Sequence, residues 1–248
     1  MLKTIPGAAA LNRGERNGSE DEGLPAYMDL LSHDILNLNQ TVLSYIELMV
    51  SSPDLDPRSG EHAKKAASQI RISTQIVEGI NALCLLQKER NVVTTTANLK
   101  EEVDGVERAL QSLLPYRGVH CTVDTEDEAP VVNVKNLVSQ SILNAVMNMA
   151  QLDPSEEPKI DIHVKRCEGG GNNDWVVRIH DANAEFPPGV ELDSVVDERG
   201  ESRSRIVKLA GVLLSKLMVE RLGGKIKVDR DGEHAGAISL TFKGAQTK

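Results

Sequence analysis

Apolar side chains recur at alternating steps of three and four residues along positions 28–49. They are Met28, Leu31, Ile35, Leu38, Val42, Tyr45 and Met49. A stripe with this heptad spacing follows one side of an α-helix and has to be covered by other helices. The sequence therefore predicts a long helix that enters near Pro25, ends at Val50 and packs in a helical bundle.

A second heptad stripe follows a turn-rich break at 51–60 and predicts another helix over about 61–89. Its members are Ala66, Ile70, Ser73, Val77, Ile80 and Cys84. Two such helices joined by a short loop form an antiparallel hairpin. One hairpin cannot cover both stripes, so we expect a homodimer in which two hairpins pair into a four-helix bundle. The alternative is that the hairpin packs on the rest of its own chain.

Beyond residue 91, short strands are mixed with helices. Helices are predicted over 99–114, 134–152 and 206–222, and strands over 92–96, 119–123, 160–164, 175–179, 225–228 and 237–242. Turn signals at 169–173 and 231–232 predict that the last four strands form two hairpins. The expected fold class is α+β, with one sheet covered by helices on one face. The predicted domains are a polar flexible leader (1–23), the helical hairpin (24–91) and the sandwich (92–248).

Composition excludes several classes of protein. The 248 residues carry a formal charge of -9 without a dense basic run, which argues against nucleic-acid binding. No apolar stretch approaches the roughly 18 residues that a membrane span needs, so we expect no membrane insertion. The three cysteines form no Cys-x-x-Cys pair, which argues against a zinc site and a disulfide scaffold and indicates the reducing cytoplasm.

The first predicted helix carries His33, followed directly by Asp34 and one turn later by Asn37. His33 lies two residues past a stripe position and should therefore face solvent. A neutral imidazole is a competent nucleophile near pH 7, and a neighbouring carboxylate can hold one ring nitrogen as N–H. Asn37 lies on about the same helix face as His33. The plain alternative is a polar surface patch.

From about residue 25 to its end, the chain resembles the transmitter core of two-component sensor histidine kinases. The stretch 31–48 is similar to the H-box helix of archaeal members. The resemblance implies that His33 is the phosphoacceptor, that Asp34 is the general base and that Asn37 orients water when a partner is dephosphorylated. It also implies a dimeric hairpin, a Bergerat-type ATPase sandwich over 92–248, and a response regulator receiver domain as partner.

The nucleotide-binding motifs of that family are kept only in part. Asn144 and Asn148 match its N-box, which implies that Asn148 ligates the Mg²⁺ bridging the phosphates of ATP and that Asn144 approaches those phosphates. Asp181 matches the acid that accepts a hydrogen bond from the adenine amino group. Asn183 and Glu185 stand where the family has two glycines after this acid. Glu185 adds a negative charge that would repel phosphates if it faces the site.

The second glycine motif is also altered. Aligned back from Gly223-Gly224, the family's Gly-x-Gly-Leu falls on residues 209–212, where Leu209 replaces one glycine and Gly211 is kept. A helix N-terminus is expected to cradle phosphate at this point. ATP and Mg²⁺ are therefore expected cofactors whose binding is weakened or lost.

These features predict a cytoplasmic phosphotransferase of the protein-histidine kinase type. His33 accepts a phosphoryl group, from ATP if the altered site still works, and passes it to an aspartate of a response regulator, with phosphatase activity through Asn37. One alternative is a pseudokinase that binds no ATP and is loaded from a phosphorylated regulator. Another is a scaffold that binds a regulator without chemistry.

Overall fold

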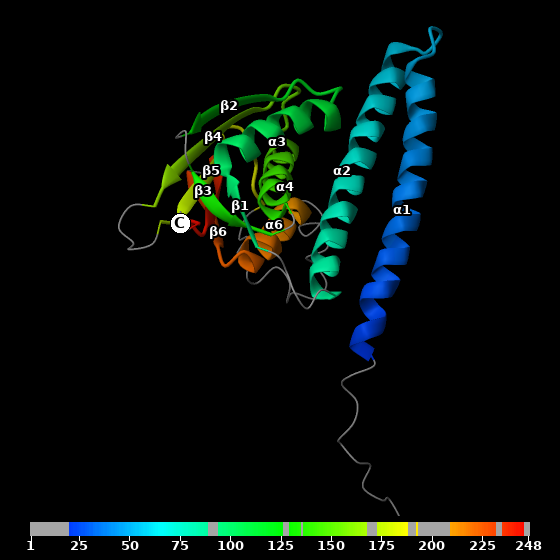
Figure 1. Ribbon diagram of the computed structural model, residues 1–248. Coiled ribbons are helices and arrows are strands. Elements are labelled where there is room, and N and C mark those ends of the chain that lie inside the picture. Colours follow the sequence, from blue (N-terminus) through cyan, green and yellow to red (C-terminus); the bar gives the residue numbers. More distant parts are fainter. Residues whose placement is uncertain are drawn as a thin grey trace, which may run out of the picture.

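The computed structural model shows a helical hairpin beside an α/β sandwich (Figure 1). The residues it describes are 20–88, 94–125, 129–134, 136–167, 173–187, 192, 209–231 and 235–245, with side chains of the first helix from Leu31 onward. Most of the predicted leader, residues 1–19, lies outside this description. So do residues 169–172 of the turn predicted at 169–173, Gly232 of the turn predicted at 231–232, and the first residues of the helix predicted from 206.

The hairpin consists of α1 (Glu20–Val50) and α2 (Pro57–Lys88). The prediction that the first helix enters near Pro25 is wrong by about one turn. Acidic residues at 20–22 favour a helix start through the helix dipole, and Pro25 is close enough to that start to remove only one backbone hydrogen bond. The helix predicted from about 61 also begins earlier, at Pro57.

Asp56 explains the early start of α2. Its Oδ1 accepts a hydrogen bond from the Ser59 amide at 3.0 Å, which is the geometry of an N-cap, and Pro57 suits the first helical position. Hydrogen bonds from Ser59 hold the pKa of the Asp56 carboxyl below its ordinary value. The turn-rich break is therefore shorter than the sequence pattern indicated.

The two helices of the hairpin are joined by polar contacts. The Asn39 amide donates to the hydroxyls of Ser73 and Thr74, each at 3.2 Å, and Arg71 Nη2 lies 2.6 Å from Glu47 Oε1. The α1 stripe faces away from α2 and is exposed. Its described members range from 41% exposed to 67% exposed, namely Leu31, Ile35, Leu38, Val42, Tyr45 and Met49.

The sandwich contains two sheets where the sequence predicted one. The larger sheet has the strand order β2-β4-β5-β7-β6. Its strands are β2 (His120–Thr125), β4 (Lys159–Arg166), β5 (Trp175–Asp181), β6 (Lys225–Asp231) and β7 (Ala235–Phe242). Strands β2 and β4 are parallel, and all other neighbouring strands are antiparallel. The smaller pairs β1 (Thr95–Asn98) with β3 (Pro130–Asn133). The sequence missed β3 because four residues opened by a proline give no strand pattern.

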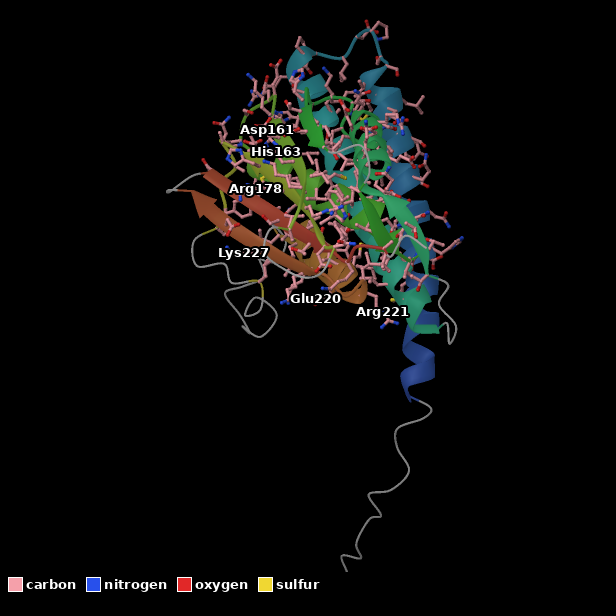
Figure 2. All side chains as sticks on the ribbon, turned by 60° about the vertical axis from the view of Figure 1, so that its left-hand side comes forward. Asp161, His163, Arg178, Glu220, Arg221 and Lys227 are labelled. Atoms are coloured by element: carbon pink, nitrogen blue, oxygen red, sulfur yellow. The ribbon has the colours of Figure 1, made fainter. Side chains whose placement is uncertain are left out.

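Helices α3 (Leu99–Leu113), α4 (Leu137–Leu152) and α6 (Ala210–Arg221) cover one face of the larger sheet (Figure 1). The alternating residues Ile160, Ile162 and Val164 of β4 point into this core. The opposite face is polar, and Figure 2 shows labelled side chains of the sheet such as His163 and Arg178 on the side away from the hairpin. The predicted α+β fold is confirmed.

Helix α4 begins at Leu137, three residues later than predicted. Asn136 has a left-handed φ of 61°, which a continuous α-helix does not allow, and the Leu137 amide donates to the Val134 carbonyl at 2.9 Å. Asn133 Oδ1 accepts from the Val138 amide at 3.3 Å, so a side chain caps the first turn of the helix.

Helix α2 packs against the sandwich along α4 and α6 (Figure 1). Gly79 is buried at this contact, where a Cβ atom would lie 2.4 Å from Leu214 Cδ2. Arg71 also lies over the ring of Tyr116, 5.9 Å from its centroid. The chain therefore covers one side of α2 itself, as the alternative predicted, and leaves the α1 stripe uncovered.

Candidate phosphotransfer and nucleotide sites

His33 lies on the solvent side of α1. Its side chain is 70% exposed, and that of Asp34 is 64% exposed. The Nδ1 atom of His33 lies 3.3 Å from Asp34 Oδ1. If Nδ1 carries the proton, it donates to this carboxylate and Nε2 is left as the nucleophile. The helical spacing thus brings together the two residues that the sequence singled out, with nothing of the described hairpin covering the imidazole.

Asn37 lies over the same ring. Its Nδ2 atom is 3.2 Å from His33 Nδ1 and 3.4 Å from Nε2. The side chain is exposed, and the neighbouring Thr41 hydroxyl bonds the Asn37 backbone carbonyl rather than the amide. An amide in this position can hold a water beside the imidazole.

Asn144 and Asn148 lie on the buried side of α4, and each is only 2% exposed. The Asn144 amide donates to the Met218 sulfur at 3.7 Å, and the Asn148 amide donates to Gln151 Oε1 at 3.4 Å. Both asparagines that were predicted to bind the nucleotide are therefore held within the packing of α4 against α6. Neither side chain opens toward solvent.

The first turn of α6 closes over these asparagines. A Cβ atom on Gly211 would lie 2.6 Å from the Asn144 carbonyl oxygen and 2.9 Å from Asn148 Cβ. Leu209, at the N-cap of α6, is fully buried and provides no side-chain cap. Gly211 is thus required for helix–helix contact, because any side chain would push the two helices apart.

Asp181 ends β5 and is fully buried beside Asp153, which follows α4. Its Oδ1 accepts from the Asn183 amide at 2.8 Å, and Asp153 Oδ1 accepts from the Ser155 amide at 2.6 Å. No N–H or hydroxyl of the described residues reaches Oδ2 of either carboxyl. The two carboxyls interact with each other, and each affects the pKa of the other.

The two carboxyls have opposite pKa shifts. Burial, together with the negative charge of Asp153, raises the pKa of Asp181 above its ordinary value. Burial also opposes ionisation of Asp153, but hydrogen bonds from Ser155 and the charge of Arg117 outweigh it and lower the pKa of Asp153. The pair therefore holds its proton on Asp181 and its negative charge on Asp153.

Arg117 is a part of this site that the sequence did not reveal. Its guanidinium donates to the backbone carbonyls of Ala150, Asp153 and Ser155 at 2.5 to 2.6 Å. It thus satisfies carbonyls at the C-terminal end of α4. Asp153 and Arg117 lie 36 residues apart, and no local pattern indicates that they meet.

Two cavities adjoin the carboxyl pair. One, of about 550 Å³, is lined by Asp153, Pro154, Ser155, Ala182, Asn183 and Glu185. The other, of about 510 Å³, lies between α2 and the end of α4 and is lined by Gln69, Ile72, Ser73, Ile76, Val77, Gln151, Leu152, Pro154 and Glu185. They share Pro154 and Glu185 and therefore lie next to each other, and we call the two together the interdomain groove.

Solved structures provide the comparison, since no family model and no curated protein matches this sequence. Full-length ShkA in complex with AMPPNP is similar at a TM-score of 0.54 and 14% identity, over 90% of this chain and 47% of that chain. The chain has the fold of a sensor histidine kinase transmitter core.

Two further similar structures are smaller. The mycobacterial sensor histidine kinase MprB gives a TM-score of 0.46 and 16% identity, over 62% of this chain and 100% of that chain. The catalytic domain of the histidine kinase ThkA gives a TM-score of 0.49 and 16% identity, over 61% of this chain and 97% of that chain. Identities this low leave the activity to be argued from the residues.

The residues of this chain fit the two halves of ATP differently. Asp181 provides a buried carboxyl next to a cavity, which suits the amino group of a base. On the predicted phosphate and Mg²⁺ side, within the described residues, Gly211 packs directly on Asn144 and Asn148. Glu185 is exposed in the groove and adds negative charge there.

A membrane span is not found in the described part of the chain, where every helix is too short or too polar to cross a bilayer.

Proposed function

We propose that this transmitter core acts as a histidine phosphotransfer protein, in which His33 exchanges a phosphoryl group with an aspartate of a response regulator receiver domain. The observation that carries the proposal is the exposed group on α1, with His33 within 3.3 Å of Asp34 and 3.2 Å of Asn37. Because the imidazole is open to solvent, another protein can reach it. We place this reaction in the cytoplasm.

The chemistry needs only these side chains and the phosphorylated partner. Asp34 holds the Nδ1 proton, and the Nε2 lone pair attacks the phosphorus of an aspartyl phosphate. An N–P bond forms as the acyl P–O bond breaks, and the aspartate leaves as a carboxylate. The reverse step returns the phosphoryl group to an aspartate, so the same site loads and unloads His33.

Asn37 supports a second reaction of the same complex. When His33 carries no phosphoryl group, the Asn37 amide can orient a water for in-line attack on the aspartyl phosphate of the bound regulator. Hydrolysis then releases inorganic phosphate and restores the aspartate. The transmitter core would thereby also reset its regulator.

ATP, rather than a phosphorylated regulator, is the second candidate for the phosphoryl donor to His33. The retained Asp181, buried beside a cavity, favours it. The packing of Gly211 on Asn144 and Asn148 favours loading from a regulator, because it holds both asparagines in the contact between α4 and α6.

A homodimer completes the proposal. The α1 stripe is an apolar surface in which Leu38 is 65% exposed and Tyr45 is 67% exposed. Soluble proteins rarely leave such a continuous stripe in water. Pairing of two hairpins through α1 would cover it and present one His33 from each chain.

The experiment compares two phosphoryl donors on the full chain. One is labelled ATP with Mg²⁺; the other is a panel of receiver domains from the same genome, each loaded from labelled acetyl phosphate. We expect label that is stable in alkali and labile in acid to reach the chain from at least one receiver, and to be lost in His33→Gln.

Each outcome separates the candidates. Label from ATP that is lost in His33→Gln would establish the autokinase instead of the relay. Absence of label from every donor, with a native circular dichroism spectrum, would contradict both and leave a scaffold that binds regulators. His62→Gln, which alters another exposed histidine of the hairpin, is the matched control and should label like the parent.

A further inference from the structure

The outward face of the larger sheet carries a concentration of positive charge. Val164, Val177 and Leu240 are buried against the helices, so their neighbours along each strand point outward. The register of β4, β5, β7 and β6 aligns these outward residues in two rows, which we call the basic sheet face. One row is Lys165, Val176, Thr241 and Lys225, and the other is His163, Arg178, Ser239 and Lys227. Figure 2 labels His163, Arg178 and Lys227 of the second row.

The basic sheet face has more positive charge than its neighbours neutralise. Asp229 of β6 lies just beyond the second row and pairs both with Arg178, at 3.6 Å, and with Lys227. Lys165 and Lys225 are exposed and form no ion pair with the described residues. The described ion pairs therefore neutralise these four cations with a single carboxylate, in a chain whose formal charge is -9. Such a local excess of positive charge favours a negatively charged partner at this face.

The spacing of the cations suits an extended polypeptide. Adjacent strands are about 4.8 Å apart, so the backbones of Lys165 and Lys225, three strand spacings apart, are separated by about 14 Å. An extended chain covers about 14 Å in four residues and presents every second side chain on the same side. A segment that lies across the strands with carboxylates at alternate positions therefore meets a lysine at each end and Arg178 between them.

The surroundings of the basic sheet face favour a short acidic segment over a nucleic acid or a membrane. Asp124, Asp161 and Asp229 border the two rows and would repel phosphates that extend beyond them. Among the described residues, the large exposed apolar side chains lie on α1 and α6, and Trp175 is only 1% exposed. This face therefore offers neither an apolar anchor for lipid nor an aromatic ring on which a base could stack.

We infer that the basic sheet face docks an acidic segment of another protein, which lies in extended conformation across β4, β5, β7 and β6. Carboxylates of the segment pair with Lys165, Arg178 and Lys225, and the hydroxyls of Ser239 and Thr241 donate hydrogen bonds to it. Helices α3, α4 and α6 separate this face from the hairpin (Figure 1), so the docked protein does not compete with a receiver at His33. The inference goes beyond phosphotransfer by His33 and does not depend on it.

Calorimetric titration of the full chain tests the inference with a short synthetic peptide that carries glutamate at every second position. The same peptide with glutamine at those positions is the control probe. We expect the glutamate peptide to bind at least about tenfold more tightly than the glutamine peptide. Its affinity should also fall by about tenfold or more between about 0.1 M and about 1 M NaCl, because the Debye length shortens from about 10 Å to about 3 Å.

Two double variants locate the peptide. Lys165→Glu combined with Lys225→Glu reverses the charge at both ends of the basic sheet face and should weaken binding of the glutamate peptide by about tenfold or more. Arg58→Glu combined with Lys65→Glu, on α2, changes the net charge by the same amount and should bind the peptide like the parent. All four side chains are exposed, so both double variants should keep the circular dichroism spectrum of the parent.

The contrary results are equally definite. Equal binding of the two peptides, equal weakening by the two double variants, or absence of binding of the glutamate peptide at millimolar concentration would each overturn the inference. A short DNA duplex and vesicles of phosphatidylcholine with phosphatidylserine are the competing probes. Tighter binding of either one than of the glutamate peptide would also overturn it, and would assign the basic sheet face to a nucleic acid or to a membrane surface.

Discussion

The reactive groups of this protein lie in two separate regions: an exposed imidazole on α1 and a pair of buried carboxyls in the sandwich. His33 is 70% exposed on α1, where a protein partner can reach it, whereas Asp181 is fully buried at the end of β5. The contacts of His33 with Asp34 and Asn37 were predictable because helical spacing alone sets them. The pairing of Asp181 with Asp153 was not predictable, because it depends on how β5 meets the end of α4.

Asn37→Ala should slow dephosphorylation of a bound regulator by about tenfold or more while leaving transfer to His33 within about twofold of the parent. The reason is that the amide is needed to place a water, whereas the imidazole and Asp34 carry the transfer. Release of inorganic phosphate from a labelled receiver measures the first step. Gln40→Ala, also exposed on α1, is the control, and equal loss of both steps in Asn37→Ala would refute the assigned role.

Asp181→Asn should stabilise the protein at neutral pH. Because burial and Asp153 raise the pKa of Asp181, the folded chain holds this proton to higher pH than the unfolded chain does. Its contribution to the free energy of unfolding therefore falls as pH rises from the ordinary range of an aspartate through the raised pKa. An asparagine does not ionise and avoids this loss.

Thermal unfolding across pH measures the effect. The melting temperature of Asp181→Asn should exceed that of the parent near pH 7, and the difference should vanish below about pH 4, where the carboxyl is protonated in both states. Asp54→Asn, in the exposed turn between α1 and α2, is the control. A pH-independent difference would show that the proton on Asp181 is not its cause.

Most elements of the fold could be predicted from the periodicity of apolar residues. The errors concern element boundaries and one short strand, which are determined by interactions that leave no period in the sequence. The heptad stripes and the alternation in β4 and β5 identified those elements, because burial of one face leaves a sequence period. Helix starts were misplaced at Pro25 and Asp56, where a dipole or a side-chain cap outweighs the apolar pattern. The short β3 was missed because its pairing with β1 leaves no such period.

Gly79→Ala tests the docking of α2 on α6. In an isolated helix the change would stabilise by about 1 kcal/mol, but here the new Cβ would lie 2.4 Å from Leu214 Cδ2 and 3.2 Å from Met218 Cε. We expect a lower free energy of unfolding, by about 1 to 3 kcal/mol, from overpacking. Urea denaturation measures it.

Gly105→Ala in α3 is the matched substitution, because the nearest atom to its new Cβ is 4.0 Å away. It should stabilise by up to about 1 kcal/mol. If Gly79→Ala stabilised the chain as much as Gly105→Ala does, the contact between α2 and α6 would not hold in solution.

The whole molecule has one apolar surface that its own described elements do not cover. Helix α1 lies beyond α2 from the sandwich (Figure 1), and its stripe is exposed. The stripe was predictable from the sequence, but its exposure was not. Sequence spacing shows that a face is apolar; only the packing of α2 on the sandwich shows which face remains free.

Charge placed in the α1 stripe should separate the dimer. Leu38→Glu combined with Tyr45→Glu places four like charges across the proposed bundle, and we expect a monomer by light scattering at micromolar concentration, where the parent is a dimer. Leu217→Glu, at a 55% exposed leucine of α6, is the matched control and should stay dimeric. A monomeric parent would contradict the proposed four-helix bundle.

Forward transfer from the chain to a receiver tests phosphotransfer by His33 most directly. The full chain is phosphorylated chemically on histidine with phosphoramidate, and loss of the phosphoryl group is followed after mixing with each receiver of the panel in Mg²⁺. We predict rapid transfer from the parent to at least one receiver and none from His33→Gln, although other exposed histidines such as His62 and His120 remain. Equal transfer from His33→Gln, or retention of the phosphoryl group by the parent with every receiver, would contradict the assignment of His33 as the phosphoacceptor.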